Sequence, residues 1–145
     1  MTIPATFKNN FAVAACSLFA LLFTYAALSK ILDFENFQVQ LGQSPLLTAF
    51  AGPVSYSVPI AELLLAVLLF IESTRTVALF CSYSLMCMFT AYIYIILNWS
   101  AFIPCSCGGI LERLGWTEHL VFNVAFIILG ITALFCLPSD NNPKS

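Results

Sequence analysis

The chain has 145 residues, of which 61% are hydrophobic and only 8% are charged. A soluble domain has about 25% charged residues. This composition therefore excludes an ordinary water-soluble globule and predicts an integral membrane protein whose surroundings are the lipid bilayer. The formal net charge is −2. Because the sequence contains no cluster of lysine or arginine, it also argues against nucleic acid as a partner.

Four apolar runs have about the length of a membrane-spanning helix. They cover residues 11–30, 58–73, 76–99 and 118–137. A signal peptide is an alternative for the first run, but its apolar part is longer than the usual length of about 7–15 residues, and Lys8 is the single cation before it. The sequence therefore predicts an all-α membrane protein, a four-transmembrane-helix bundle, formed as a single domain over residues 1–145.

Short helices are expected in the connection between the first two spans. Asp33 is a candidate N-cap for a helix over residues 34–41, which Gly42 would end. Ser44-Pro45 would start a second short piece, and Gly52-Pro53 would end it. Both pieces have apolar faces, so we expect interfacial helices that cover the outer mouth of the bundle.

Signals at two helix starts place polar side chains inside the spans. Pro59 is expected in the first turn of the second span, which would put Glu62 about one turn inside it. Thr117 is a candidate N-cap for the fourth span. His119 and Asn123 follow one turn apart, on one face of that helix.

The cysteines divide into two groups. Four of the six, Cys16, Cys81, Cys87 and Cys136, lie in apolar runs and are interpreted as packing residues. Cys105 and Cys107 flank one serine between the third and fourth spans. In an extended segment, the Cα atoms of residues i and i+2 lie about 6.5 Å apart, within bridging range. A bridge across so small a loop would be strained and oxidising, which favours a disulfide donor.

Two other interpretations of this cysteine pair stay open. The pair could form a structural disulfide, or be inert, and only brace the loop. Alternatively, the thiolates of Cys105 and Cys107 could bind zinc or copper together with His119. The metal interpretation lacks a second cluster of ligands, so thiol–disulfide exchange is the preferred one.

The expected topology brings the polar residues of the spans to the depth of the cysteine loop. Lys30 ends the first span, Glu62 begins the second and His119 begins the fourth. An ionisable residue inside a span usually faces a partner or a cavity. Glu62 could form an ion pair with Lys30 or His119 that has a purely structural role. Alternatively, all three residues could form a polar site under Cys105 and Cys107. In that site, His119 and Lys30 would stabilise a thiolate.

Basic residues in the loops suggest an orientation. Lys8, Arg75 and Lys144 would lie inside if both termini are cytoplasmic, and Lys30 and Arg113 would lie outside. Paired loop thiols also suit an oxidising compartment. We therefore expect a multi-pass protein of the cell inner membrane whose cysteine loop is periplasmic.

Several motifs resemble those of a known family. They are Ser29 to Phe37, Ser44-Pro45, Pro59 to Leu63, Pro104 to Gly109, Trp116, His119 and Phe122-Asn123. Together they resemble the DoxX-like membrane proteins, and the cysteine loop is similar to that of their methylamine utilisation branch, the MauE family. Many members of the family have Cys-x-Cys-Phe-Gly, whereas this chain has Gly108-Gly109.

The resemblance implies a four-helix bundle akin to quinone-linked thiol oxidases, with a thioredoxin-like or other cysteine-containing exported partner and a quinone as the possible electron acceptor. We therefore predict an integral membrane thiol–disulfide redox protein that supports disulfide formation or maturation of an exported partner. Its catalytic residues would be Cys105, Cys107, His119, Glu62 and Lys30. The alternatives are a non-catalytic scaffold for a small exported protein and a protein that handles metal or haem.

Overall fold

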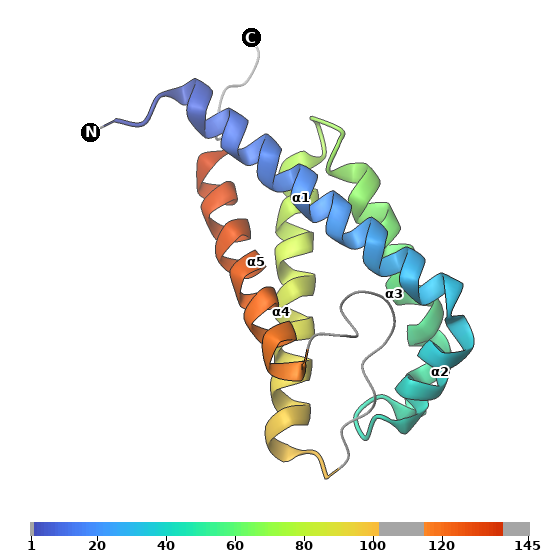
Figure 1. Cartoon of the computed structure of the whole chain (residues 1–145). Helices are drawn as coiled ribbons and strands as arrows, with labels where there is room; N and C mark the ends of the chain where they lie inside the picture. Colours follow the sequence, from blue (N-terminus) through green and yellow to red (C-terminus); the bar gives the residue numbers. More distant parts are fainter. Residues whose placement is uncertain (1, 102–114, 138–145) are drawn as a thin grey trace.

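The computed structural model describes residues 2–101 and 115–137, and within these ranges the regular structure is entirely helical. The elements are α1 (Ala5–Leu32), α2 (Phe34–Gln43), the 3-10 helix η1 (Thr48–Phe50), α3 (Ala51–Leu68), α4 (Arg75–Trp99) and α5 (Trp116–Cys136) (Figure 1). Four helical stretches are long and apolar enough to cross a membrane: α1, η1 with α3, α4 and α5. The predicted all-α, four-span fold is therefore confirmed.

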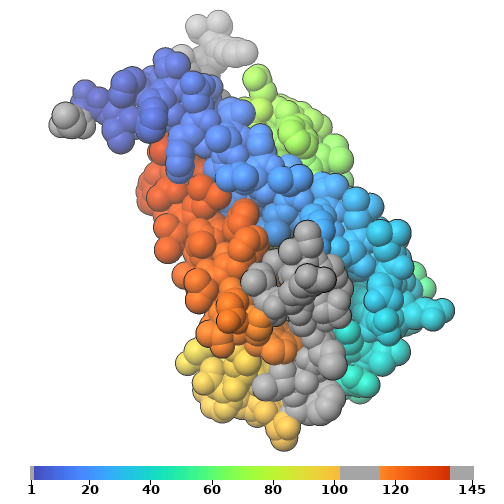
Figure 2. Space-filling model, in the orientation of Figure 1, coloured from blue at the N-terminus to red at the C-terminus, as the bar shows by residue number. Residues whose placement is uncertain are grey.

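The spans alternate in direction, so their ends gather in two groups. The N-terminus, the turn after α3 and the end of α5 lie at one end of the bundle (Figure 1). The junction of α1 with α2, the end of α4 and the start of α5 lie toward the other end. Helix α1 packs against both α3 and α5, and α4 packs along α5. Figure 2 shows α1 and α5 side by side on one face of the molecule.

Small residues allow the helices to approach closely. Ala12, Ala15, Ala20 and Ala27 of α1 are all buried. Gly130 of α5 is also buried, and a Cβ atom added there would lie 3.3 Å from the rings of both Phe19 and Tyr83. Small residues of this kind are typical of helix interfaces in membranes, because association there depends on close packing.

Large apolar side chains also cover the outside of the bundle. Leu21, Phe80 and Phe135 are 69%, 59% and 83% exposed. Helices that are apolar on every side are expected in a bilayer, where the outer side chains meet lipid. The four cysteines in the spans are free thiols: Cys16 is buried, Cys81 is exposed, and Cys87 and Cys136 are intermediate.

The start of the second span differs from the prediction. Helix α3 begins at Ala51, so Gly52 and Pro53 lie in its first turn, and Pro59 lies inside the helix. The first four backbone N–H groups of a helix have no acceptor within it, so proline is tolerated there. The helix ends at Leu68 instead of residue 73. Glu62 consequently lies about three turns into α3, deeper than predicted.

Other helix boundaries also need correction. Gly42 does not end α2, which continues to Gln43. Gly115, and not Thr117, is the N-cap of α5. Asp33 is the N-cap residue of α2, as predicted, but its carboxylate accepts hydrogen bonds from the side chain of Asn36 instead of capping the backbone.

The ends of the spans differ from the prediction by smaller amounts. Helix α1 covers residues 5–32, which is longer than the predicted 11–30. Helices α4 and α5 lie within two residues of their predicted bounds. The composition of the apolar runs therefore located the spans better than the individual start and stop signals did.

Candidate functional site

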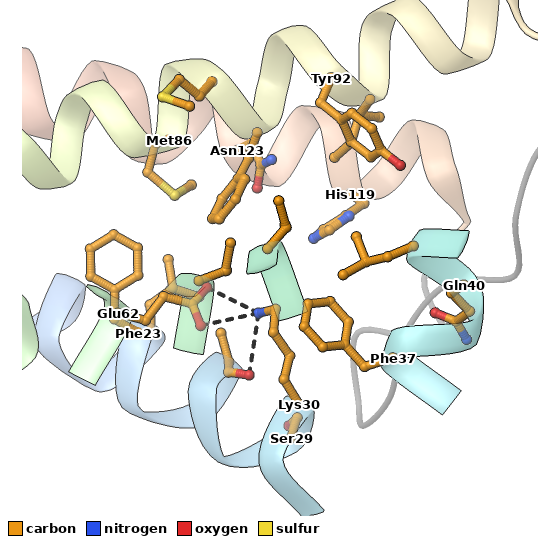
Figure 3. A pocket seen from close by; sticks show the side chains of 18 of the residues that line it. Phe23, Ser29, Lys30, Phe37, Gln40, Glu62, Met86, Tyr92, His119 and Asn123 are labelled. Carbon is orange, nitrogen blue, oxygen red and sulfur yellow. Dashed lines mark hydrogen bonds and ion pairs between the residues drawn. The ribbon is translucent and has the colours of Figure 1, made fainter. Parts of the chain in front are cut away.

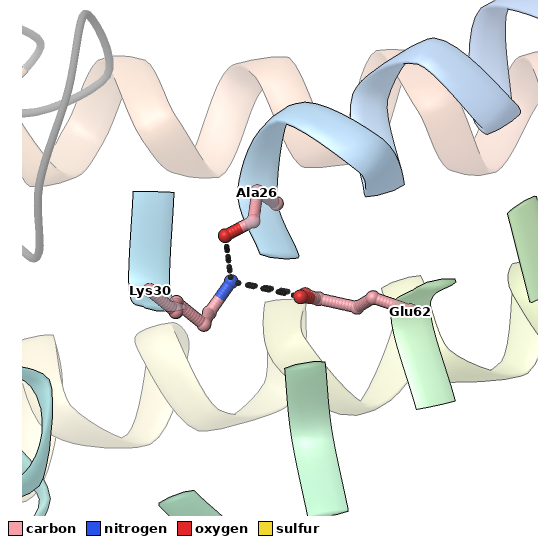
Figure 4. Close-up of polar contacts among 3 residues, drawn as sticks. All are labelled: Ala26, Lys30 and Glu62. Atoms are coloured by element: carbon pink, nitrogen blue, oxygen red, sulfur yellow. Dashed lines mark hydrogen bonds and ion pairs between the residues drawn. The ribbon is translucent and has the colours of Figure 1, made fainter. Parts of the chain in front are cut away.

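An ion pair joins the end of α1 to the middle of α3. The ammonium nitrogen of Lys30 lies 3.0 Å and 3.2 Å from the two carboxylate oxygens of Glu62 and 3.3 Å from the carbonyl oxygen of Ala26 (Figure 4). The side chain of Glu62 is fully buried and that of Lys30 is 18% exposed. Three oxygen atoms thus surround a group that has three hydrogens to donate. Of the two partners that the sequence left open for Glu62, Lys30 and His119, the structure shows Lys30.

A cavity of about 470 Å³ lies beside this pair. All five α-helices contribute to its wall, which is mainly apolar. Phe23 of α1, Phe37 of α2 and Met86 of α4 are among the lining residues (Figure 3). The polar groups of the cavity therefore stand out against an aliphatic and aromatic lining.

Helix α5 contributes two polar side chains to the cavity. His119 and Asn123 lie one turn apart on the same face, and Figure 3 shows both across the cavity from Lys30. Asn123 is only 4% exposed, and His119 is half-buried. Among the residues that the structure describes, neither side chain has a hydrogen-bonding partner. Their donors and acceptors are therefore available to the cavity.

Helix α2 and the segment after it close one side of the cavity. Phe37 and Leu41, one turn apart, are buried. Beyond the helix, the hydroxyl of Tyr92 in α4 donates a hydrogen bond of 2.6 Å to the Oγ atom of Ser44, which is fully buried. The sequence indicated the apolar face of α2 through the spacing of Phe37 and Leu41. It gave no signal for the contact between Ser44 and Tyr92.

The structure brings three of the five predicted site residues, Lys30, Glu62 and His119, to this one cavity. Cys105 and Cys107 lie outside the described residues. The segment that contains them joins α4 to α5, and Trp116, the first residue of α5, lines the cavity.

A further polar residue at the end of α4, Asn98, does not line the cavity. Asn98 is exposed, and its amide donates a hydrogen bond of 2.8 Å to the carbonyl oxygen of Tyr94. This bond joins residues four apart at the end of α4, so Asn98 belongs to the helix end and not to the cavity.

Metal ligands were considered in the same region. Within residues 2–101 and 115–137, no group of three or more histidine, cysteine, aspartate or glutamate side chains could hold a metal ion. The zinc or copper hypothesis involves Cys105 and Cys107, which are outside these ranges, so it stays a hypothesis.

Four apolar helices around a partly polar cavity define a multi-pass helical membrane protein. Comparison with family models gives a more specific result: the model described as methylamine utilisation protein MauE matches residues 8–136. The chain therefore belongs to the MauE family, and the resemblance seen in its sequence is confirmed. Comparisons with curated proteins and with solved structures found no match.

Proposed function

We propose that this MauE-family protein exchanges disulfides with an exported partner through Cys105 and Cys107. One observation supports this proposal above all: the helix that follows the cysteine segment begins at the wall of the polar cavity. Trp116 and His119, in the first turn of α5, both line it. Cys107 precedes Trp116 by nine residues, a length of chain that can span at most about 30 Å. The thiols are thus tethered within reach of His119.

The exchange requires two substitution steps. A thiolate of the partner attacks one sulfur of the Cys105–Cys107 disulfide, a mixed disulfide forms, and the other loop sulfur leaves as a thiolate. The second thiolate of the partner then attacks the mixed disulfide and releases the remaining loop sulfur. The partner loses two electrons and becomes oxidised, and the loop pair gains two electrons. The partner class that we propose is a thioredoxin-like or other exported protein with two cysteines.

The three residues on the cavity have different parts in this proposal. Lys30 directs its hydrogens to Glu62 and Ala26, so it stabilises a thiolate less directly than the sequence suggested. Lys30 and Glu62 are better assigned as positioning residues that fix α1 against α3. His119 forms no hydrogen bond to the other described side chains, and the N–H of its imidazole can donate a hydrogen bond to the leaving loop thiolate.

We further propose that the protein resides in the cell inner membrane with both termini cytoplasmic and the cysteine loop periplasmic. The N-terminus and the turn before Arg75 lie at the same end of the bundle (Figure 1). Lys8 and Arg75 therefore share one side, which agrees with the excess of basic residues expected on the cytoplasmic face.

The experiment is to trap a partner. In Cys105→Ser or Cys107→Ser, the remaining thiol should form a mixed disulfide that cannot resolve within the loop. A partner that is captured by either variant, released by reduction and absent from the Cys105→Ser/Cys107→Ser double variant would support the exchange. Cys81→Ser is the matched control, because Cys81 is a free thiol in α4. Equal capture by the double variant would contradict the proposal.

A structural role is the second candidate function, and the Lys30–Glu62 pair favours it. The three acceptor oxygens around Lys30 match its three hydrogens. The pair can therefore have the purely structural role of holding α1 against α3. The protein would then be a membrane scaffold for a small exported partner. In that case the double cysteine variant would still support maturation of the partner.

A further inference from the structure

The cavity occupies one part of the membrane-spanning bundle, toward the end at which α1 meets α2 (Figure 1). Its lining in the four spans comes from residues 22–30, 54–62, 86–93 and 116–123. An α-helix rises about 1.5 Å per residue, so each of these stretches is about 10–12 Å long. The hydrocarbon core of a bilayer is about 30 Å thick. The cavity therefore fits within the depth of a single leaflet.

The cavity reaches the outside of the bundle between α3 and α4. Ser57 of α3 and Met88 of α4 both line it, and both are exposed, Met88 by 66%. Helix α3 packs mainly against α1 and α2, whereas α4 packs mainly against α5. The pair α3 and α4 is therefore less closely joined. Because the exposed side chains of a span meet lipid, this side opening faces the interior of the bilayer.

The charges of the cavity restrict which part of a lipid can enter. Glu62 and Lys30 neutralise each other, and three oxygen atoms already surround the ammonium group of Lys30. A phosphate or a carboxylate would have to break this pair, because the described wall contains no other lysine or arginine. The uncharged chain of a lipid is therefore favoured inside the cavity, and a charged headgroup is favoured outside it.

We propose that the cavity binds one acyl chain of a membrane phospholipid, which enters between α3 and α4. An empty apolar cavity lacks the dispersion contacts that its lining could make, and a chain supplies them. The volume of about 470 Å³ lies within the usual range of small-molecule sites, about 300–1,000 Å³. The chain would lie along the helices, as the other chains of the same leaflet do, and the headgroup would stay at the membrane surface.

The polar side chains of the wall suit the ester end of such a chain. Ser29, near the end of α1, and His119, near the start of α5, both line the cavity. A hydroxyl and an imidazole N–H can each donate a hydrogen bond, and an ester carbonyl accepts one. Phe23 and Met86 lie farther from these helix ends and offer an apolar surface to the chain. No cysteine lines the described wall, so this binding does not depend on the proposed thiol exchange.

The test uses the fluorescence of a tryptophan in the cavity wall. Trp116 lines the cavity, and the chain has two tryptophans, so the Trp99→Phe variant reports Trp116 alone. The full-length variant is placed in nanodiscs of phosphatidylcholine. The host lipid is then replaced stepwise by phosphatidylcholine that is brominated near the ester end of its chains. Because bromine quenches tryptophan on contact, a single bound chain should lower the fluorescence in linear proportion to the brominated fraction.

Two further substitutions in the Trp99→Phe protein close the site. Ala26→Phe fills the cavity, because Ala26 lines it, and Ser57→Phe places a ring at the side opening. Both variants should lose most of the quenching. Ala91→Phe is the matched control, because Ala91 is exposed on α4 and does not line the cavity. Its quenching should equal that of the Trp99→Phe protein.

Circular dichroism checks that each variant is folded. If Ala26→Phe is not folded, Ser57→Phe decides the test, because Ser57 is exposed. Three results overturn the proposal. The first is equal quenching in Ser57→Phe and Ala91→Phe, which would mean that Trp116 meets only bulk lipid. The second is no quenching by the brominated phospholipid. The third is stronger quenching by brominated oleic acid at the same fraction of brominated chains, which would identify a free fatty acid as the ligand.

Discussion

Lys30 and Glu62 lie 32 residues apart in the chain, yet the nitrogen of one is 3.0 Å from a carboxylate oxygen of the other. The contact connects the last turns of α1 to the interior of α3, at the wall of the cavity. A buried pair of this kind contributes little compared with two apolar residues, but the loss of one partner leaves an uncompensated charge. The pair therefore constrains geometry more than it stabilises the fold.

The first prediction follows from this asymmetry. Glu62→Gln and Lys30→Met should each lower the free energy of unfolding by about 3 kcal/mol, because each leaves a buried group without its partner. The Lys30→Met/Glu62→Gln double variant should recover most of this loss. Unfolding in mixed micelles, followed by circular dichroism during titration with dodecyl sulfate, measures all three values.

Lys8→Met provides the control for removal of a cation, because Lys8 is exposed near the start of α1. Its stability should match that of the wild type. Additive losses in the double variant would show that Lys30 and Glu62 act independently, and the pair would lose its assigned role.

The second prediction concerns the hydrogen bond of 2.6 Å between Tyr92 and Ser44. Tyr92→Phe keeps the ring and removes the bond, so the segment after α2 should loosen by about 1 kcal/mol. Hydrogen exchange of the amides in α2 and η1 should accelerate about fivefold, the equivalent of that energy.

Tyr94→Phe is the matched control for the hydroxyl. The ring of Tyr94 packs edge-on against Trp99 at the end of α4, 6.0 Å between centroids. In Tyr94→Phe, the hydrogen exchange of the amides in α2 should be as slow as in the wild type. If both variants accelerate exchange in α2 equally, the bond to Ser44 does not secure that segment.

Composition predicted the fold, because four long apolar runs have few other solutions in a bilayer. Individual residues that signal the start or end of a helix predicted the boundaries less well where one motif fits both a start and an end. Gly52-Pro53 resembles a helix end, but Pro53 occupies a first turn, where its missing N–H has no consequence. As a result the second span was placed seven residues too late, at residue 58 instead of Ala51.

The site was predictable where it depends on helix periodicity or on span topology. His119 and Asn123 share a face because they are four residues apart, and Lys30 met Glu62 because their spans are antiparallel. The contact of Ser44 with Tyr92 joins residues 48 apart, and no pattern in the sequence encodes it. The volume of the cavity likewise depends on how all five helices pack.

The third prediction tests the proposed orientation. In intact spheroplasts, a membrane-impermeant maleimide should label Cys105 and Cys107 after mild reduction. A cysteine introduced by Asn9→Cys, in the exposed first turns of α1, should be labelled only after lysis. The reverse pattern would show that the loop is cytoplasmic.

The last prediction compares two glycines that differ in their surroundings. A Cβ atom at Gly130 would lie 3.3 Å from Phe19 and 3.3 Å from Tyr83, whereas a Cβ atom at Gly42 would meet nothing within 4 Å. Gly130→Val must push α5 away from its neighbours and should lower the free energy of unfolding by about 1–3 kcal/mol. Gly42→Val introduces the same side chain into α2 without that contact, so it should show no loss of this size. Unfolding titrations in the same micelles compare the two. If both variants lose equal stability, helix propensity and not close packing accounts for the glycine in α5.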